Sequence, residues 1–247
     1  MEPHKQGANS SLTIGPLRRP IGPIVDTQPA KRPERVTLEG RFVSLTPLNA
    51  ASHSDALFDA ANGGDKDQVW DYLFDGPYAD REVFRANIEA KAKSDDPLFF
   101  AIIDKKSGQP LGYQTFLRIE PTHRVIEVGN ILYTLGLQRT PGATEAQYLF
   151  ARYVFDELGY RRYEWKCNAH NAPSQRAAQR LGFTFEGVFR QHMIVKGRNR
   201  DTAWYSMLDH EWPARRAAYE RWLAPKNFDA AGRQIVSLSS LNGARSS

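Results

Sequence analysis

Short stretches rich in apolar residues, some of which alternate with polar residues, recur along the chain and predict β-strands. The first stretch, residues 36–45, alternates around Gly40 and predicts a strand or a hairpin-like pair. Three stretches in the middle of the chain predict a β-meander, at 98–104, 110–119 and 124–134. Three further strands are predicted nearer the C-terminus, at 162–167, 183–195 and 202–208, the last two joined by a basic turn at 196–200.

Between these stretches, apolar residues three and four positions apart predict helices. The helical segments are 50–62, with Asn49 as its N-cap, 65–74, 80–95, 141–158, 172–181 and 210–223. Pro97, Gly159 and Gly182 stand where three of these segments should stop. Antiparallel strands therefore come first and a strand–helix–strand–helix unit follows, an order that predicts an α+β fold with a mixed sheet.

The two ends of the chain lack this periodicity. Residues 1–35 hold six of the 15 prolines and are predicted to form an extended N-terminal tail. Residues 225–247 are predicted to form a C-terminal tail, although Ile235, Val236 and Leu238 would fit one extra strand. We therefore expect a single domain over residues 36–224.

The composition is that of an ordinary globular domain, with 41% hydrophobic and 25% charged residues. No apolar run approaches the roughly 18 residues that span a bilayer. The N-terminus lacks the apolar stretch of a signal peptide. The single cysteine, Cys167, cannot form an internal disulfide. These features lead us to expect a cytoplasmic protein without a membrane partner.

The formal net charge of +5 comes from the two predicted tails, because residues 36–224 hold equal numbers of basic and acidic side chains. A neutral domain lacks the basic stripe of a nucleic-acid-binding surface. Nucleic acid is therefore not an expected partner, and an accessory role of the basic tails in binding it is the weakest functional hypothesis. The six histidines show no metal-ligand spacing such as HExxH, so we expect no bound metal.

The junction at residues 133–146 has the features of an anion-binding helix start. A predicted strand ends, a polar loop follows, and Thr140 and Pro141 suit the N-cap and the first position of a long helix. Unpaired N–H groups at such a start attract anions, and the helix dipole adds to the attraction. The geometry suits a phosphate or pyrophosphate, although a capped helix without a ligand is the simpler interpretation of these residues alone.

A second segment, Asn171 and Ser174 followed by Leu181-Gly182-Phe183, opens and closes the next predicted helix. Asn171 is a good N-cap and Gly182 a good helix stop. Taken alone, these residues indicate an ordinary capped helix with Ser174 in its first turn.

Together, in this order and spacing, the two segments resemble the GNAT superfamily of acyl-CoA-dependent N-acetyltransferases. The nearer branch is the RimJ/RimL type, the N-terminal acetyltransferases of ribosomal proteins. The superfamily pattern Gln/Arg-x-x-Gly-x-Gly/Ala aligns with residues 138–143, and further matches to the branch lie at 144–146, 171–174, 181–183, 200–206 and 211–212. The resemblance covers residues 36–223. It implies a mixed, mostly antiparallel twisted sheet of about seven strands flanked by helices.

The resemblance also implies acetyl-CoA as the co-substrate. Backbone N–H groups of the loop would bind the CoA pyrophosphate, and the Arg139 guanidinium would add a charged contact. The chain departs from the pattern at Pro141, which replaces the central glycine and has no N–H. The CoA-binding residues implied are Leu137, Gln138, Arg139, Thr140, Gly142, Ala143, Thr144 and Asn171.

Three residues are candidates for proton transfer during acetylation of an amine. Glu127 alternates with apolar residues on the predicted strand 124–134, so it would accept the amine proton or form a salt bridge. By resemblance, Ser174 would protonate the departing CoA thiolate, and Tyr133 is a further phenol for which packing is the simpler interpretation. Gly129 would mark a bulge in the strand. Cys167 is better explained as a small buried side chain than as a nucleophile.

The resemblance implies an enzyme that acetylates a primary amine of a small molecule or of a peptide or protein N-terminus. Arg118, His123 and Arg124 would attract an acidic acceptor, although charges at strand ends are usually only solvated. The neutral domain slightly favours a small molecule. The alternative is a non-catalytic CoA-binding or protein-interaction module of the same fold, which Pro141 keeps open. A homodimer is compatible with either function.

Overall fold

A computed structural model gives the structure of residue 19 and of residues 21–243. Within these residues, eight strands form one sheet in the order β1-β2-β3-β4-β5-β6-β8-β7. Neighbouring strands are antiparallel except β5 and β6, which are parallel. The strands are β1 (Leu38–Glu39), β2 (Val43–Pro47), β3 (Leu98–Asp104), β4 (Pro110–Glu120), β5 (Val125–Tyr133), β6 (Arg162–Asn168), β7 (Thr184–Val195) and β8 (Arg198–Leu208).

This sheet confirms the predicted α+β fold with a mixed, mostly antiparallel sheet. The eighth strand arises because residues 36–45 form a pair, β1 and β2, rather than one strand.

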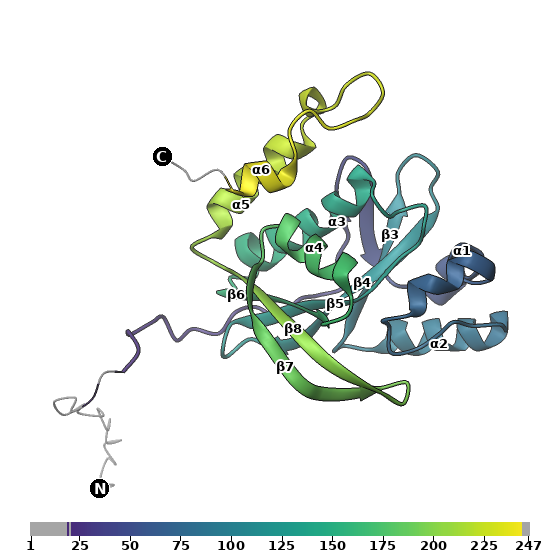
Figure 1. Cartoon of the computed structure of the whole chain (residues 1–247), viewed down its shortest axis with the longest axis horizontal. Helices are drawn as coiled ribbons and strands as arrows, with labels where there is room; N and C mark the ends of the chain where they lie inside the picture. The colour runs from purple at the N-terminus through teal and green to yellow at the C-terminus, as the bar shows by residue number, and fades with distance from the viewer. Residues whose placement is uncertain (1–18, 20, 244–247) are drawn as a thin grey trace, which may run out of the picture.

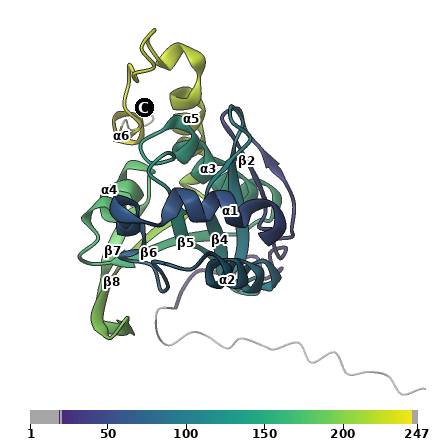
Figure 2. The ribbon, with the colours of Figure 1, turned by 90° about the vertical axis from the view of Figure 1, so that its right-hand side faces the viewer.

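Helices cover both faces of the sheet (Figures 1 and 2). On the α1/α2 face, helices α1 (Ala50–Ala61) and α2 (Arg81–Lys93) and the 3-10 helix η1 (Gly64–Trp70) pack on one apolar cluster. The α3/α4 face carries a larger cluster beneath α3 (Pro141–Arg152), its π-helical continuation η2 (Tyr153–Glu157), α4 (Ala172–Arg180) and α5 (Trp212–Leu223). No helix among the described residues is both long and apolar enough to cross a membrane.

The helices on the α1/α2 face begin where the sequence supplies N-caps. The Asn49 side-chain oxygen accepts a hydrogen bond from the Ser52 N–H at 3.2 Å. The Asp80 carboxylate does the same for the Glu82 N–H at 2.7 Å. Between them, the segment predicted as a helix at 65–74 is a 3-10 helix that ends at Trp70, whose indole donates to the Ala61 carbonyl at 2.7 Å.

The predicted start of the last strand is wrong by several residues. β8 begins at Arg198, which pairs with Val195, so only Lys196 and Gly197 form the turn. Both turn residues have positive φ, 49° and 72°. This is the backbone of a tight two-residue hairpin, and its twist matches that of the paired strands. The basic residues at 198–200 therefore belong to the sheet, not to a loop.

The predicted C-terminal tail is also wrong for residues 225–243. The 3-10 helix η3 (Pro225–Asn227) and helix α6 (Leu238–Gly243) follow α5, and Leu238 is fully buried in the large cluster. The Asn227 side chain bonds to the backbone of Trp222 and Val236 and so ties the segment together. Helix α6 has six residues, too few to show a periodic pattern in the sequence.

Part of the predicted N-terminal tail also contacts the domain. The Ala30 N–H donates to the Pro121 carbonyl and the Lys31 N–H to the Leu158 carbonyl, each at 3.0 Å. Arg35 pairs with Asp95 at 2.7 Å. Residues 1–18, 20 and 244–247 of the two predicted tails lie outside the described residues.

Candidate active site

Strands β5 and β6 separate halfway along their length. They pair only from Val125–Val128 with Arg162–Trp165, and the second half of each strand has no partner in the other. At the separation, β5 carries one extra residue relative to β4, between Gly129 and Leu132. Asn130 takes up this bulge with a φ of 46°, a conformation that Asn tolerates better than most residues. The bulge predicted at Gly129 is therefore centred one residue later.

The loop that follows β5 folds on its own backbone. The Thr134 carbonyl accepts hydrogen bonds from the N–H groups of Leu137 and Gln138, both at 3.0 Å. The Thr140 hydroxyl caps α3 by accepting from the Ala143 N–H at 3.2 Å, and it donates to the Leu137 carbonyl at 2.7 Å. Five backbone N–H groups of this loop, those of residues 137, 138, 139, 142 and 143, are the expected donors to the pyrophosphate, and three of them, at 137, 138 and 143, already have acceptors within the loop.

The other two expected donors, the N–H groups of Arg139 and Gly142, have no acceptor among the described residues. Arg139 has a φ of 61° and an exposed side chain. Gly142 is held against β2, where a Cβ would come within 2.9 Å of a methyl group of Val43. These two free amides flank Pro141 at the start of α3, where the helix dipole adds to the attraction for an anion.

The two side chains after Ala143 hold the helix in place. The Glu145 carboxylate accepts hydrogen bonds from the N–H groups of residues 41, 42 and 43, at 2.8, 2.6 and 2.9 Å. It thereby fixes the turn between β1 and β2 against α3. The Thr144 hydroxyl, expected to bind CoA, accepts a hydrogen bond from the Arg180 guanidinium at 3.0 Å.

Glu127 lies on β5, on the α1/α2 face, in a salt bridge. Its Oε2 atom lies 2.8 Å from the Lys166 Nζ atom and 3.5 Å from the Arg118 Nε atom. No described residue donates a hydrogen bond to the other carboxylate oxygen, Oε1. Burial raises the pKa of Glu127, and Lys166 acts against this shift. Glu127 therefore forms the salt bridge that was one of its two expected roles. Its Oε1 atom has no donor among the described residues, so the other expected role, accepting a proton, stays open to it.

Lys166 connects Glu127 to a longer series of charges along the α1/α2 face. Its Nζ atom also lies 2.8 Å from Glu164, which bonds to Arg162 at 2.7 Å. Burial opposes ionisation of Glu164, but these two cations lower its pKa overall. The Lys166 ammonium also lies 3.7 Å from the centre of the Trp204 ring. The sequence signal for this series was present, because alternation along β6 places Glu164 and Lys166 on the face opposite Trp165.

Ser174 lies in the first turn of α4, on the other side of β6. Asn171 caps this helix by accepting a hydrogen bond from the Ser174 N–H at 3.1 Å. The Ser174 hydroxyl accepts from the Trp165 indole N–H at 3.0 Å, which leaves its own hydrogen available to donate. Burial raises the pKa of the neighbouring Cys167 thiol, and the Ser174 hydroxyl partly offsets the shift. The thiol is buried in the apolar cluster.

Tyr133 ends β5 in a buried polar group. Its hydroxyl donates to the Gln114 side-chain oxygen at 2.7 Å and accepts from the Gln147 amide at 2.7 Å. Burial raises the pKa of Tyr133, and the bond from Gln147 acts in the other direction. The Tyr133 hydroxyl already donates one hydrogen bond and accepts another, and its pKa is raised. It is therefore better suited to holding β5 in position against α3 than to donating a proton.

The arginines suggested as attractors of an acidic acceptor have partners of their own. Arg118 contacts Glu127, and Arg124 donates to the Gly159 carbonyl at 3.0 Å and pairs with Asp26. A different arginine, Arg200 on β8, is buried two positions before Thr202, which pairs with Asn168 at the end of β6.

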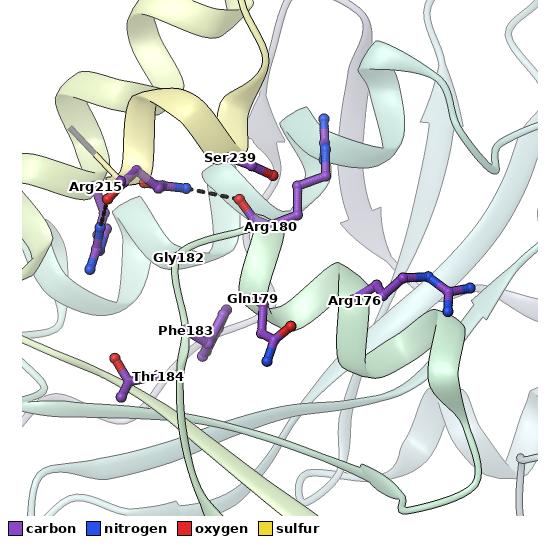
Figure 3. Close-up of a pocket in the computed structure, with 10 residues that line it drawn as sticks. Arg176, Gln179, Arg180, Gly182, Phe183, Thr184, Arg215 and Ser239 are labelled. Atoms are coloured by element: carbon purple, nitrogen blue, oxygen red, sulfur yellow. Dashed lines mark hydrogen bonds between the residues drawn. The ribbon is translucent and has the colours of Figure 1, made fainter.

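A surface pocket of about 590 Å³ lies elsewhere, between α4, α5 and α6 (Figure 3). Arg176, Arg180 and Arg215 line it, but their side chains point in different directions in Figure 3 and do not converge on one point. The pocket therefore does not have the geometry of a site for one anion, and it marks where the C-terminal segment packs on α4.

A parallel pair of strands that separates beside the anion-attracting start of a helix, in a sheet of this order, is the arrangement expected of an acyl-CoA-dependent N-acetyltransferase. Residues 43–184 match the family model for the acetyltransferase (GNAT) domain. The chain belongs to the GNAT superfamily, and its relatives support the RimJ/RimL-type branch.

The crystal structure of a GCN5-related N-acetyltransferase from Brucella melitensis is 55% identical to this chain. The match covers 87% of this chain and 97% of that one, with a TM-score of 0.85. Two curated relatives match over shorter segments. The p20 protein of Bacillus licheniformis, an uncharacterized N-acetyltransferase, is 31% identical over 115 residues, which are 46% of this chain and 63% of p20.

The second curated relative is YdaF of Bacillus subtilis (strain 168), which is provisionally named a ribosomal N-acetyltransferase. It is 35% identical to this chain over 60 residues. These residues are 24% of this chain and 33% of YdaF. The chain thus spans less than two thirds of the length of either curated relative.

Proposed function

We propose that this chain transfers the acetyl group of acetyl-CoA to a primary amine. The observation that carries this proposal is the separation of β5 from β6 beside the start of α3. Beyond Val128, the backbone groups on that edge of β5 pair with no strand of the described residues and would be available to the amides of a pantetheine chain and to the thioester carbonyl.

The N–H groups of Arg139 and Gly142, together with the Arg139 guanidinium, would bind the CoA pyrophosphate. Pro141 lies between them without an N–H, so fewer backbone donors serve the phosphates than the family pattern provides. The Leu137, Gln138 and Ala143 amides and the Thr140 and Thr144 hydroxyls would shape this loop through the hydrogen bonds they already make. Asn171 would contact CoA from the start of α4, beside the end of β6 that diverges from β5.

In the reaction, the amine nitrogen forms a bond to the thioester carbonyl carbon and the carbon–sulfur bond breaks, which yields an amide and the CoA thiolate. The available Oε1 atom of Glu127 would accept the proton that the amine loses. The Ser174 hydroxyl would donate a proton to the thiolate. Tyr133 would hold the end of β5 in position and take no proton in either step.

The acceptor class within this proposal is a small-molecule amine or a peptide or protein N-terminus. Incubating the chain with acetyl-CoA and a panel of both kinds of amine, followed by mass spectrometry, tests the proposal. A mass gain of one acetyl group on an amine, dependent on the chain, is the expected result. Stabilisation of the chain by CoA with no acetylated amine from either class would favour the non-catalytic CoA-binding module instead.

A further inference from the structure

Arg200 is a buried cation that has no ion-pair or hydrogen-bond partner among the side chains of residues 19 and 21–243. Only 7% of its surface is exposed. None of its guanidinium N–H groups makes a hydrogen bond or ion pair with a described residue, and its Nε atom is fully buried without an acceptor. A guanidinium stays charged under all ordinary conditions. Leaving such a charge buried and unpaired is costly, so this arrangement calls for an anion that the described residues do not supply.

The other buried charged side chains in this part of the structure are satisfied. Glu127 and Glu164 share the Lys166 ammonium, and Glu145 accepts three backbone hydrogen bonds. Arg200 is the exception among them. Burial lowers its pKa, and the charges of Cys167 and, to a smaller extent, Glu127 act in the opposite direction, although neither side chain forms an ion pair or hydrogen bond with it.

The position of Arg200 indicates which ligand would meet it. Along β8, Arg200 lies on the same face as Trp204, the residue that stacks on Lys166. This is the α1/α2 face, which also carries Glu127. The start of α3 packs on the opposite face. An anion at Arg200 would therefore be on the side of the proposed base, not on the side of the CoA pyrophosphate.

The segment after η1 covers this position. The Phe74 ring lies 5.2 Å from the Arg200 guanidinium carbon, and the Lys196 side chain in the β7–β8 turn donates to the Trp70 carbonyl at 2.9 Å. Half of the Phe74 side chain is exposed. The aromatic ring protects one face of the guanidinium from water, while the N–H groups on its edge donate to no acceptor in the part of the chain that the structure describes.

We propose that Arg200 binds an anionic oxygen group, carboxylate or phosphate, of the amine acceptor. This rests on the proposed acetyl transfer and narrows its substrate class to amines that carry an acidic group. A guanidinium presents N–H groups in a planar fork that matches two oxygens of either group. The acceptor amine would then face Glu127 while its acidic group is held at Arg200.

Matched pairs of acceptors test the role of Arg200 by steady-state kinetics. One pair consists of α-amino acids and their carboxamides, and the other of phosphoethanolamine and ethanolamine, so that the carboxylate and phosphate sources are distinguished. We expect the wild-type chain to prefer the acidic member of one pair. Arg200→Gln should raise KM for that member by about 10- to 100-fold, the range for a lost charge-assisted hydrogen bond, with little change in KM for its neutral partner.

Arg198→Gln is the matched control, because Arg198 is an exposed arginine two positions earlier on the same strand. It should leave the preference between acidic and neutral acceptors unchanged. Equal KM values of the wild-type chain for both members of both pairs, or a preference that Arg200→Gln retains, would overturn the proposal.

A binding measurement separates this proposal from the acetyl transfer itself. N-acetylated amino acids and N-acetylphosphoethanolamine, added without CoA, should raise the melting temperature of the wild-type chain but not that of Arg200→Gln. Such stabilisation in a chain that acetylates no amine would support the anion site and refute the transfer. If none of these compounds raises the melting temperature of the wild-type chain, the proposed anion site at Arg200 is wrong, and the proposed acetyl transfer is not affected.

Discussion

Lys166 donates a hydrogen bond to Glu127 across the parallel strands β5 and β6, at 2.8 Å. The two side chains are 6% and 7% exposed, so both charges depend on each other rather than on water. Lys166 lies one residue beyond Trp165, the last residue of β6 that pairs with β5, so the bond joins the strands where they begin to separate. The proposed base of the reaction is therefore also a structural tie between the two strands.

Changing a neighbouring charge should move the pH dependence of the reaction. Burial raises the pKa of Glu127, and Arg118 is one of the cations that lower it. If Glu127 accepts the amine proton, kcat/KM should fall as pH decreases through its pKa. Arg118→Gln removes a lowering cation, so this acid limb should shift to higher pH. Glu127→Gln should lower the rate most at low pH and be partly rescued at high pH, where the amine deprotonates unaided.

Arg124→Gln provides the control for this pH profile, because Arg124 pairs with Asp26 and not with Glu127. A profile that has the same acid limb in the wild-type chain, Arg118→Gln and Glu127→Gln would show that another group accepts the proton.

Removing Lys166 should destabilise the fold in a pH-dependent way. Lys166→Met leaves two buried carboxylates without their shared cation, which should cost about 3–5 kcal/mol at neutral pH. In this variant the folded-state pKa of Glu127 rises further above its unfolded value, so stability falls as pH rises through that pKa and the loss is smaller in acid. Chemical unfolding at several pH values measures the difference.

The double variant Lys166→Met with Glu127→Gln should recover part of the stability at neutral pH. If the double variant is less stable than Lys166→Met at every pH, the unpaired Glu127 charge is not the source of the loss.

Ser174→Ala should reduce kcat by at most about 10²–10⁴-fold, the usual range for a general acid. The affinity for acetyl-CoA should change little, because the hydroxyl would act in the transition state. Trp165→Phe should be measured beside Ser174→Ala, because it removes the indole N–H that donates to the Ser174 oxygen but keeps the Ser174 hydroxyl. Normal turnover per folded Ser174→Ala molecule would leave protonation of the thiolate to water.

Arg139→Ala should weaken CoA binding without unfolding the chain, because the Arg139 side chain is exposed. The rise in melting temperature at a fixed CoA concentration reports the affinity by mass action. Arg221→Ala, an exposed arginine on α5, should leave the CoA-dependent rise at its wild-type value. No rise in the wild-type chain at millimolar CoA would contradict the loop assignment as a whole.

The C-terminal segment should contribute to stability although it was predicted to be a tail. Leu238→Ala removes a fully buried side chain, and we expect a loss of about 2–5 kcal/mol in the free energy of unfolding. Ile235→Ala, in the same segment but 65% exposed, should change it by less than about 0.5 kcal/mol. Denaturant unfolding of the two variants would show equal stability if α6 does not pack on the domain in solution.

Local sequence signals were sufficient for the elements whose limits depend on neighbouring residues. Thr140 and Asn171 cap α3 and α4 as predicted, because an N-cap bonds to an amide only three residues away. Short runs of apolar residues located the strands of the meander for a similar reason, since side chains of these strands pack into the apolar clusters on the two faces of the sheet. The α+β fold and its family followed from these signals in their order.

The partners of the charged side chains were decided only by the tertiary structure. Glu127 and Lys166 are 39 residues apart, and no periodic pattern specifies which residues on adjacent strands face each other. Leu238 and Arg200 illustrate the same limit: a single leucine in a polar segment and an arginine beside a turn both look exposed in the sequence. Their burial depends on surfaces formed by distant segments, which exist only once the sheet and its helices have assembled.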